Sequence, residues 1–337
     1  MIREAIQRIS NGHGLDEAEM HALVGDMMDG KLTDAQKGAV LVGMRMRGET
    51  VEEITGAARA MRDRMERLED VPDGAVDTCG TGGDGRGTLN VSTLAALVVA
   101  ACGVTVAKHG NRAVSSVCGS ADLLGALGVR IELSAEEASA VLRECGITFL
   151  FAPRLHPAMK QMAGVRRELG IRTIFNLLGP LTNPAFVRRQ LLGVFAPDLL
   201  ETVATVLKNL GSEHALVVHS ADGHDEISVE ATTYICELKD GEIRSYTITP
   251  AHFGLQPTAV GTLQGGSVSE NRRLALEILD GAAGIHRNTV IANAAAALYV
   301  ARAVSTFREG AGAAAECIDS GRAAEKLEQL VRMSGSV

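Results

Sequence analysis

A run of glycines directly after Ala75–Cys79, a short segment typical of a strand end, constrains the fold of this chain more than any other feature. Five of the eight residues from Gly80 to Gly87 are glycine, and an apolar helical run, Leu94–Cys102, follows. A strand, a glycine loop and a helix in this order direct backbone N–H groups and a helix N-terminus at an anion. Glycine lets bare backbone approach a phosphate and adopt φ > 0. The segment therefore predicts a phosphate-binding loop.

Two general nucleotide-binding motifs also match in part. The residues from Gly80 to Gly85 have the G-x-G-x-x-G spacing of a dinucleotide site. Such a site needs an acidic residue roughly 20 positions later for the ribose, whereas the next predicted strand, Val104–Ala107, leads into Lys108. Asp84 would also place a carboxylate where the pyrophosphate lies. The dinucleotide interpretation is therefore disfavoured.

The second partial match, Gly25–Lys31, resembles a P-loop but has Leu32 where Ser or Thr must hold Mg²⁺. Gly30 is instead placed to end a helix. We interpret this match as a coincidence.

Composition excludes several classes of partner. The 337 residues carry a formal net charge of −8, which argues against binding to nucleic acid or to an anionic membrane. An anionic substrate must then be attracted by a local basic site. The six cysteines show no CxxC pairing or metal-ligand spacing, which predicts reduced core residues of a cytoplasmic protein. The longest apolar-rich stretch, Leu94–Ala107, is too short to span a bilayer.

The chain changes character near residue 70. Residues 1–67 have helical periodicity only, with Asp16 and Thr33 as expected N-caps. Strand and helix signals then alternate, which favours an α/β fold. The expected strands are 75–79, 104–107, 147–151, 190–195, 213–219 and a pair within 226–249 turning at 239–242. The expected helices begin near 92 and span 119–127, 135–145, 154–169, 198–210 and 289–303, and the segment 172–184 is expected to be a shaped loop.

Several motifs occur in a specific order. KHGNRAVSS covers 108–116, GSAD covers 119–122 and RTIFNLLGPLTNP covers 172–184, in addition to GTGGD at 80–84 and NVST at 90–93. Together they closely resemble the anthranilate phosphoribosyltransferases, enzymes of tryptophan biosynthesis. The resemblance extends from the N-terminal helices to the segment from Ser320 to Glu328.

This resemblance implies a nucleoside phosphorylase/phosphoribosyltransferase-like fold. A small N-terminal helical domain (residues 1–70 plus about 165–185) would accompany a larger α/β domain (71–164 and 186–337) with a central mixed, mostly parallel sheet. It also implies a homodimer formed through the N-terminal helices. The apolar stripe of Ile2, Ile6, Leu23 and Met27 is more than a small helical domain easily buries, so part of it is expected in that interface, with a self-contained helical core as the alternative.

The implied reaction transfers a 5-phosphoribosyl group from 5-phosphoribosyl 1-diphosphate (PRPP) to the amine of anthranilate and releases pyrophosphate. It requires no covalent nucleophile, so we expect catalysis by positioning and electrostatics without a dedicated catalytic side chain. Apart from any role in binding, Asn90 or Ser92 could cap the helix that follows. By resemblance, PRPP would be bound by Gly80, Gly83, Asp84, Thr88, Asn90, Val91, Ser92, Thr93, Lys108, His109, Gly110, Asn111, Arg112, Ala113, Val114, Ser115, Ser116 and Ser120.

Asp225 and Glu226 are two adjacent hard oxygen ligands, and with Ser92 they would hold Mg²⁺, expected at two ions per subunit. Magnesium is usually held by one or two carboxylates plus substrate phosphates, which suits a diphosphate site. An acidic pair in a glycine-bearing loop is otherwise a solvated turn.

Arg166 is the implied partner of the anthranilate carboxylate, because a guanidinium matches a carboxylate through two parallel hydrogen bonds. Arg167 points in another direction on the same helix and is the alternative. The whole set implied to contact anthranilate is Gly80, His109, Asn111, Pro153, His156 and Arg166.

Two other functions remain to be distinguished. A nucleoside phosphorylase shares the fold and a glycine loop but lacks the KHGNRAVSS motif. A non-catalytic nucleic-acid-binding relative should lack the intact glycine loop and the carboxylate pair and should carry a basic groove, unlike this acidic chain.

Overall fold

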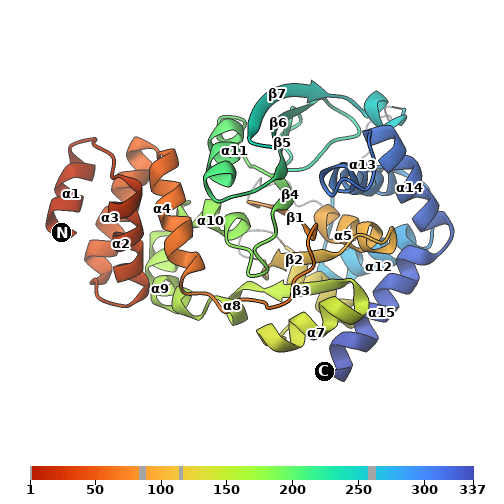
Figure 1. Ribbon diagram of the computed structural model, residues 1–337, viewed down its shortest axis with the longest axis horizontal. Coiled ribbons are helices and arrows are strands. Elements are labelled where there is room, and N and C mark those ends of the chain that lie inside the picture. Colours follow the sequence, from red (N-terminus) through yellow and green to blue (C-terminus); the bar gives the residue numbers. More distant parts are fainter. Residues whose placement is uncertain (1, 83–88, 114–116, 257–262) are drawn as a thin grey trace.

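The computed structural model describes residues 2–82, 89–113, 117–256 and 263–337, and it shows a helical part at one end of an α/β part (Figure 1). Asp16 and Thr33 form capping boxes at the starts of the second and third helices, as predicted. The first four helices are α1 (Ile2–Ser10), α2 (Glu17–Met28), α3 (Asp34–Arg47) and α4 (Val51–Arg62).

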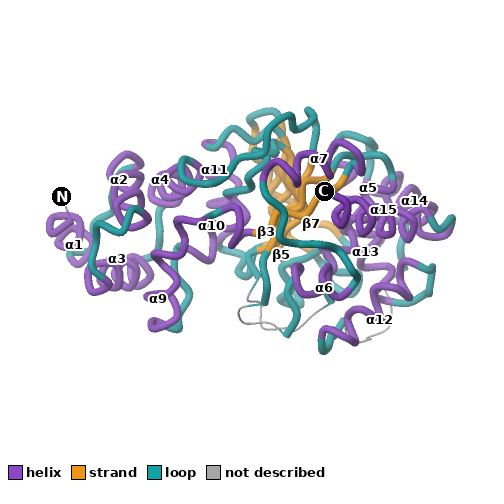
Figure 2. The backbone as a smooth tube through the Cα atoms, turned by 90° about the horizontal axis from the view of Figure 1, so that it is seen from below, coloured by secondary structure: helices purple, strands orange, loops and turns teal. Residues whose placement is uncertain are grey.

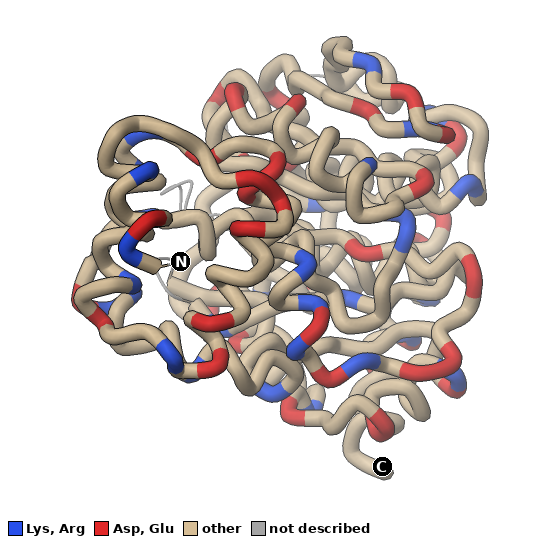
Figure 3. Tube along the Cα trace, turned by 60° about the vertical axis from the view of Figure 1, so that its left-hand side comes forward, with Lys and Arg blue, Asp and Glu red and all other residues tan. Residues whose placement is uncertain are grey.

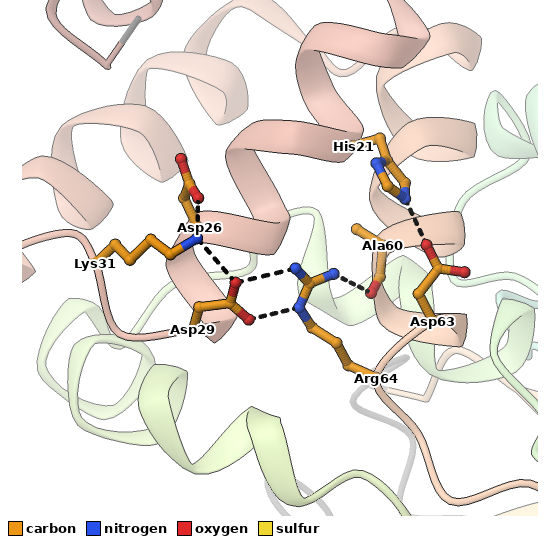
Figure 4. Close-up of polar contacts among 7 residues, drawn as sticks. All are labelled: His21, Asp26, Asp29, Lys31, Ala60, Asp63 and Arg64. Carbon is orange, nitrogen blue, oxygen red and sulfur yellow. Dashed lines mark hydrogen bonds and ion pairs between the residues drawn. The ribbon is translucent and has the colours of Figure 1, made fainter.

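An ion-pair network joins α2 to α4 across the helical part (Figure 4). The Arg64 guanidinium donates to both carboxylate oxygens of Asp29, at 2.7 and 3.1 Å, and lowers the pKa of Asp29. Lys31 pairs with Asp26 at 2.9 Å, and His21 contacts Asp63 at 2.7 Å. The region with the partial P-loop match is therefore a helix end held by ion pairs, in agreement with its interpretation as a coincidence.

A seven-stranded mixed sheet forms the centre of the α/β part, in the order β3-β2-β1-β4-β5-β6-β7. The first five strands are parallel, and β6 and β7 are antiparallel additions at one edge. The predicted mostly parallel α/β fold is confirmed. The strands are β1 (Val76–Gly80), β2 (Val106–Gly110), β3 (Ile147–Phe151), β4 (Arg189–Gly193), β5 (His214–Ser220), β6 (Thr233–Lys239) and β7 (Glu242–Ile248).

Helices cover both faces of this sheet, which explains the nearly uninterrupted burial of its parallel strands (Figure 2). On one face α5 (Val91–Ala101) and α13 (Ile285–Val300) pack against the central strands, and α11 (Leu199–Asn209) packs on the other. The remaining helices of the α/β part are α6 (Ser120–Ala126), α7 (Ala135–Cys145), α12 (Val268–Leu279), α14 (Phe307–Asp319) and α15 (Arg322–Ser336).

Two expectations about the segment 152–184 were wrong. The helix expected over 154–169 is divided into α8 (Ala152–Leu155), a 3₁₀ turn (Pro157–Met159) and α9 (Lys160–Leu169), because Pro157 cannot continue a helix. The segment expected to be a loop contains α10 (Phe175–Leu181). Pro180 lies inside this helix, one residue before its end.

The strand order places functional loops at one edge of the sheet. The carboxyl ends of the parallel strands are Gly80, Gly110, Phe151, Gly193 and Ser220, and they lie at the same edge. The order reverses between β1 and β4, and ligands of open α/β sheets bind outside the strands at such a switch point. No helix of the described ranges is long and apolar enough to cross a membrane.

Candidate active site

The loop after β5 packs directly against the glycine residues at the ends of β1 and β4. The Gly82 N–H donates to Asp225 Oδ2 at 2.9 Å. A Cβ atom added to Gly80 would lie 2.5 Å from that same oxygen, and one added to Gly193 would lie 1.5 Å from the Asp225 carbonyl oxygen. Both strand ends must therefore be glycine for Asp225 to occupy this position. The fold thus joins a predicted metal ligand to the predicted phosphate loop.

Lys108 supplies a buried cation beside this loop. Its Nζ donates to the Thr78 carbonyl at 2.6 Å and to Ser92 Oγ at 3.3 Å. Burial lowers the pKa of Lys108, whereas Asp77 and, more weakly, Glu226 favour its charged form. Lys108 therefore places a buried amine beside Ser92, one of the expected metal ligands.

Asp77 holds His109 and Asn183 in place, a role that the sequence alone did not predict. It is fully buried, and it accepts hydrogen bonds from the His109 N–H at 3.2 Å and from Asn183 Nδ2 at 2.9 Å. Burial raises the pKa of Asp77, and the attraction of Lys108 opposes that rise. A charged residue within a strand buried on both faces is a signal that could have identified it.

The three expected metal ligands have the donor chemistry that Mg²⁺ prefers. Ser92, Asp225 and Glu226 offer only hard oxygen atoms, and Ser92 and Glu226 both interact with Lys108. The described residues contain no cluster of three or more His, Cys, Asp or Glu side chains that could enclose a metal by themselves. The set therefore fits a magnesium ion that is also held by substrate oxygens, as is usual for diphosphate sites.

The N-terminus of α5 lies at the same edge. Asn90 occupies the N-cap position but makes no capping bond, and its Nδ2 donates to the Cys118 carbonyl at 3.0 Å. Of the two candidate caps, Asn90 therefore has the N-cap position, and Ser92 lies within the first turn. Asn90 Oδ1 and Thr93 Oγ1 are buried and make no hydrogen bond within the described part of the chain. The backbone N–H groups of this first turn, which begins at Val91, are the part of α5 that favours an anion.

The loop after β2 is held by α6. Ser120 Oγ donates to the Asn111 carbonyl at 3.2 Å, and the Ala113 N–H donates to Asp122 Oδ2 at 2.9 Å. Arg112 pairs with Asp122 at 3.3 Å. Gly110 also belongs to this cluster, because a Cβ there would lie 2.2 Å from Ser120 Oγ. The predicted residues Gly83, Asp84, Thr88, Val114, Ser115 and Ser116 lie outside the described residues.

Two buried histidines lie together between the sheet and α10. The rings of His109 and His156 are 5.1 Å apart, and His109 Nδ1 is 3.1 Å from the Gly179 carbonyl oxygen. Burial lowers the pKa of His109 to about 3 and that of His156 to about 4. Both imidazoles are therefore neutral at pH 7. Pro153, in α8, is exposed.

Arg166 and Arg167 differ in their surroundings. Arg166 is half-buried, its guanidinium lies 5.8 Å from the centre of the Phe175 ring, and burial lowers its pKa. Arg167 is exposed. Phe175 and Gly179 are one turn apart on α10, so Arg166 and His109 both contact that helix.

The chain matches both domains of one family. The helical bundle domain of the glycosyl transferase family matches residues 3–65, and the a/b domain of that family matches residues 72–324. An anthranilate phosphoribosyltransferase from Anaeromyxobacter sp. (strain K) is 52% identical over 331 residues, 98% of each chain. The chain belongs to the anthranilate phosphoribosyltransferase family.

Solved structures of anthranilate phosphoribosyltransferases have the same fold. The Thermus thermophilus structure has a TM-score of 0.93 at 42% identity and covers 98% of this chain and 99% of its own. The Saccharomyces cerevisiae structure in complex with PRPP and Mg has a TM-score of 0.92 at 26% identity, covering 100% of this chain and 98% of its own. The family and enzyme class expected from the sequence motifs are confirmed.

Proposed function

We propose that this chain transfers the 5-phosphoribosyl group of PRPP to the amine of anthranilate, giving N-(5-phosphoribosyl)anthranilate and pyrophosphate in tryptophan biosynthesis. The observation that carries the proposal is the convergence of Asp225, the glycine loop and Lys108 at the switch point of the sheet. Family membership supports the same activity.

The residues of the site meet the demands of this transfer by positioning and electrostatics. Negative charge develops on the departing diphosphate, and Lys108 together with the backbone N–H groups at the start of α5 would stabilise it. Bound magnesium would supply further positive charge, held by Ser92, Asp225 and Glu226, and we propose two ions per subunit. The other residues that we assign to PRPP and anthranilate are those given by the resemblance.

The acceptor side needs orientation more than base strength. An aromatic amine is uncharged at neutral pH, so its lone pair is available without a strong base. His109 and His156, neutral and buried, would form an aromatic wall beside it. Arg166 would bind the carboxylate and fix the direction from which the amine approaches the ribose carbon.

The activity is tested by the fluorescence of anthranilate in the presence of protein, PRPP and Mg²⁺. We expect the fluorescence to change with time only when all three are present. Phosphorolysis of thymidine or uridine without this change would identify a nucleoside phosphorylase instead. Binding of nucleic acid is disfavoured, because acidic and basic residues are interspersed along the chain (Figure 3).

The Arg166→Ala variant should use anthranilate poorly while it still binds PRPP. A hydrogen bond to a charged group contributes about 1.5–3 kcal/mol, so kcat/KM for anthranilate should fall roughly 10- to 150-fold. Steady-state kinetics with each substrate varied in turn measure this, and Arg167→Ala is the control because Arg167 is exposed. Unchanged anthranilate kinetics in Arg166→Ala would remove Arg166 from the site.

We also propose that the chain is a cytoplasmic homodimer and that its helical domain comprises residues 1–70 plus about 165–185. Packing of α9 against α2 and α3, and of α10 against α4, supports this domain division. The expected interface needs a correction, because Leu23 and Met27 are already buried within one chain. Ile2 and Ile6 are partly exposed and remain available, as does Met46 at the end of α3, which is 84% exposed.

Light scattering at micromolar concentration should give the mass of two subunits. Met46→Glu should shift the mass toward one subunit, because a charge buried in an apolar interface is costly. Leu276→Glu, on α12, is a control at an exposed apolar residue of the α/β part. A wild-type mass of one subunit would contradict the dimer.

A further inference from the structure

The loop between β5 and β6 carries the carboxylates Asp225 and Glu226 but has no regular secondary structure from residue 221 to 232. Backbone hydrogen bonds of a helix or sheet therefore do not hold these two residues in place. Contacts within the loop and contacts with neighbouring elements position it instead.

Asn293, in the middle of α13, clamps this loop one residue after Glu226. Its Oδ1 accepts a hydrogen bond from the Ile227 N–H at 3.1 Å, and its Nδ2 donates to the Ile227 carbonyl at 3.0 Å. Nδ2 also donates to the Thr289 carbonyl of its own helix at 2.9 Å. The amide thus ties both backbone polar groups of Ile227 to a rigid helix.

The surroundings of this clamp exclude water. Ile227 has no exposed surface, Asn293 is 3% exposed, and α13 packs against β1, β4 and β5. A polar residue in this alanine-rich helix is costly to bury unless its hydrogen bonds are made. The Asn293 amide fulfils that condition by bonding to the loop.

The other side of the loop is held locally. Asp222 accepts hydrogen bonds from the hydroxyls of Ser220 and Ser228, the latter at 2.6 Å. This turn sets the shape of the loop, whereas Asn293 connects the loop to α13. The carboxylates at 225 and 226 lie between these two attachments.

We propose that Asn293 is a positioning residue for the magnesium-binding carboxylates, which fixes Asp225 and Glu226 over the glycine loop without contacting substrate or metal. The proposal rests on the function proposed above. A binding site tolerates displacements of only about 0.5 Å. Loss of the clamp would leave two buried backbone groups of Ile227 without partners, so the loop would shift to regain them.

Asn293→Ala should therefore change the response to magnesium more than any other property. Outer-shell partners of metal ligands typically account for about 10- to 100-fold in metal affinity or activity. We expect the Mg²⁺ concentration for half-maximal activity to rise by about that factor, with an unchanged KM for anthranilate. Calorimetric titration of PRPP at stepped Mg²⁺ concentrations should show the same shift without turnover.

Two further variants separate positioning from stability. Asn293→Asp has nearly the same shape and keeps an acceptor for the Ile227 N–H, but it places a carboxylate oxygen against the carbonyl oxygens of Ile227 and Thr289, so a shift at least as large as that of Asn293→Ala is expected. Ser334→Ala is the matched control. Ser334 lies on α15, is fully buried, and its Oγ accepts a hydrogen bond from the Arg130 N–H at 3.1 Å. It should lower the melting temperature and leave the Mg²⁺ titration unchanged.

The proposal is overturned if folded Asn293→Ala keeps the wild-type Mg²⁺ titration, or loses activity equally at all Mg²⁺ concentrations. If Asn293→Ala does not fold, an unshifted titration of Asn293→Asp overturns it. A wild-type protein that turns over no anthranilate would contradict the proposed function, whereas an active wild type with unshifted variants contradicts this inference alone.

Discussion

The double variant Asp225→Asn/Glu226→Gln is expected to lose most activity at physiological Mg²⁺ and to regain part of it as Mg²⁺ is raised. PRPP brings dense negative charge to a chain of net charge −8, and two carboxylates assist its binding only if cations lie between them. At about 1.5–3 kcal/mol for each charged contact, kcat/KM for PRPP should fall by about 10²- to 10⁴-fold. Kinetics at several Mg²⁺ concentrations measure both effects.

The design keeps the shape of the site. An amide oxygen at position 225 can still accept the hydrogen bond from the Gly82 N–H, so the change removes charge and leaves the loop contact in place. Glu325→Gln/Glu328→Gln, on α15, is a control with the same change in net charge. Wild-type activity and an unshifted Mg²⁺ titration in the double variant would show that the pair is a solvated turn and that the metal is held elsewhere.

Gly193→Ala should abolish most activity through one added methyl group. Its Cβ would lie 1.5 Å from the Asp225 carbonyl oxygen, and β4 cannot retreat because it is paired with β1 on one side and β5 on the other. The loop with Asp225 must move instead. We expect kcat/KM to fall by about 100-fold or more, and the Mg²⁺ requirement to rise, since metal-site activity depends on ligand orientation.

Gly312→Ala is the matched control for this substitution. Gly312 lies within α14, with open space around its Cβ position and no positive φ. Alanine there should slightly stabilise the helix and leave activity unchanged. Circular dichroism and thermal unfolding separate a local shift in Gly193→Ala from loss of the fold, and a folded variant with wild-type kinetics would contradict the close packing of β4 on the loop.

Local features of the sequence determined many of the elements. The predicted spans of α7 and β3 are confirmed at both ends, since a capping box begins α7, a glycine with positive φ ends it and a continuously buried strand follows. The hairpin turn between Lys239 and Glu242 is confirmed as well. These features act over a few residues, so the sequence shows them directly.

The helix α10 was missed because its signals conflict. Gly179 and Pro180 are typical of a loop and oppose a helix prediction. Phe175, Leu178 and Leu181 are buried in the core that the helical part shares with one face of the sheet. This burial stabilises a short helix that local propensity alone would not favour.

The sequence by itself determined which residue types lie in or directly after each strand: the glycines after β1, the lysine in β2 and the acidic pair after β5. Their meeting was decided only by the tertiary structure. The strand order β1-β4-β5 places Gly193 between the glycine loop and the loop that carries Asp225. Asp225 contacts Gly82 although the two residues are 143 positions apart in the chain. The roles of Asp77, Gly193 and Asn293 likewise depend on the tertiary structure. A buried charge, a residue without a side chain and a buried amide each matter only through the partner that the fold brings to them.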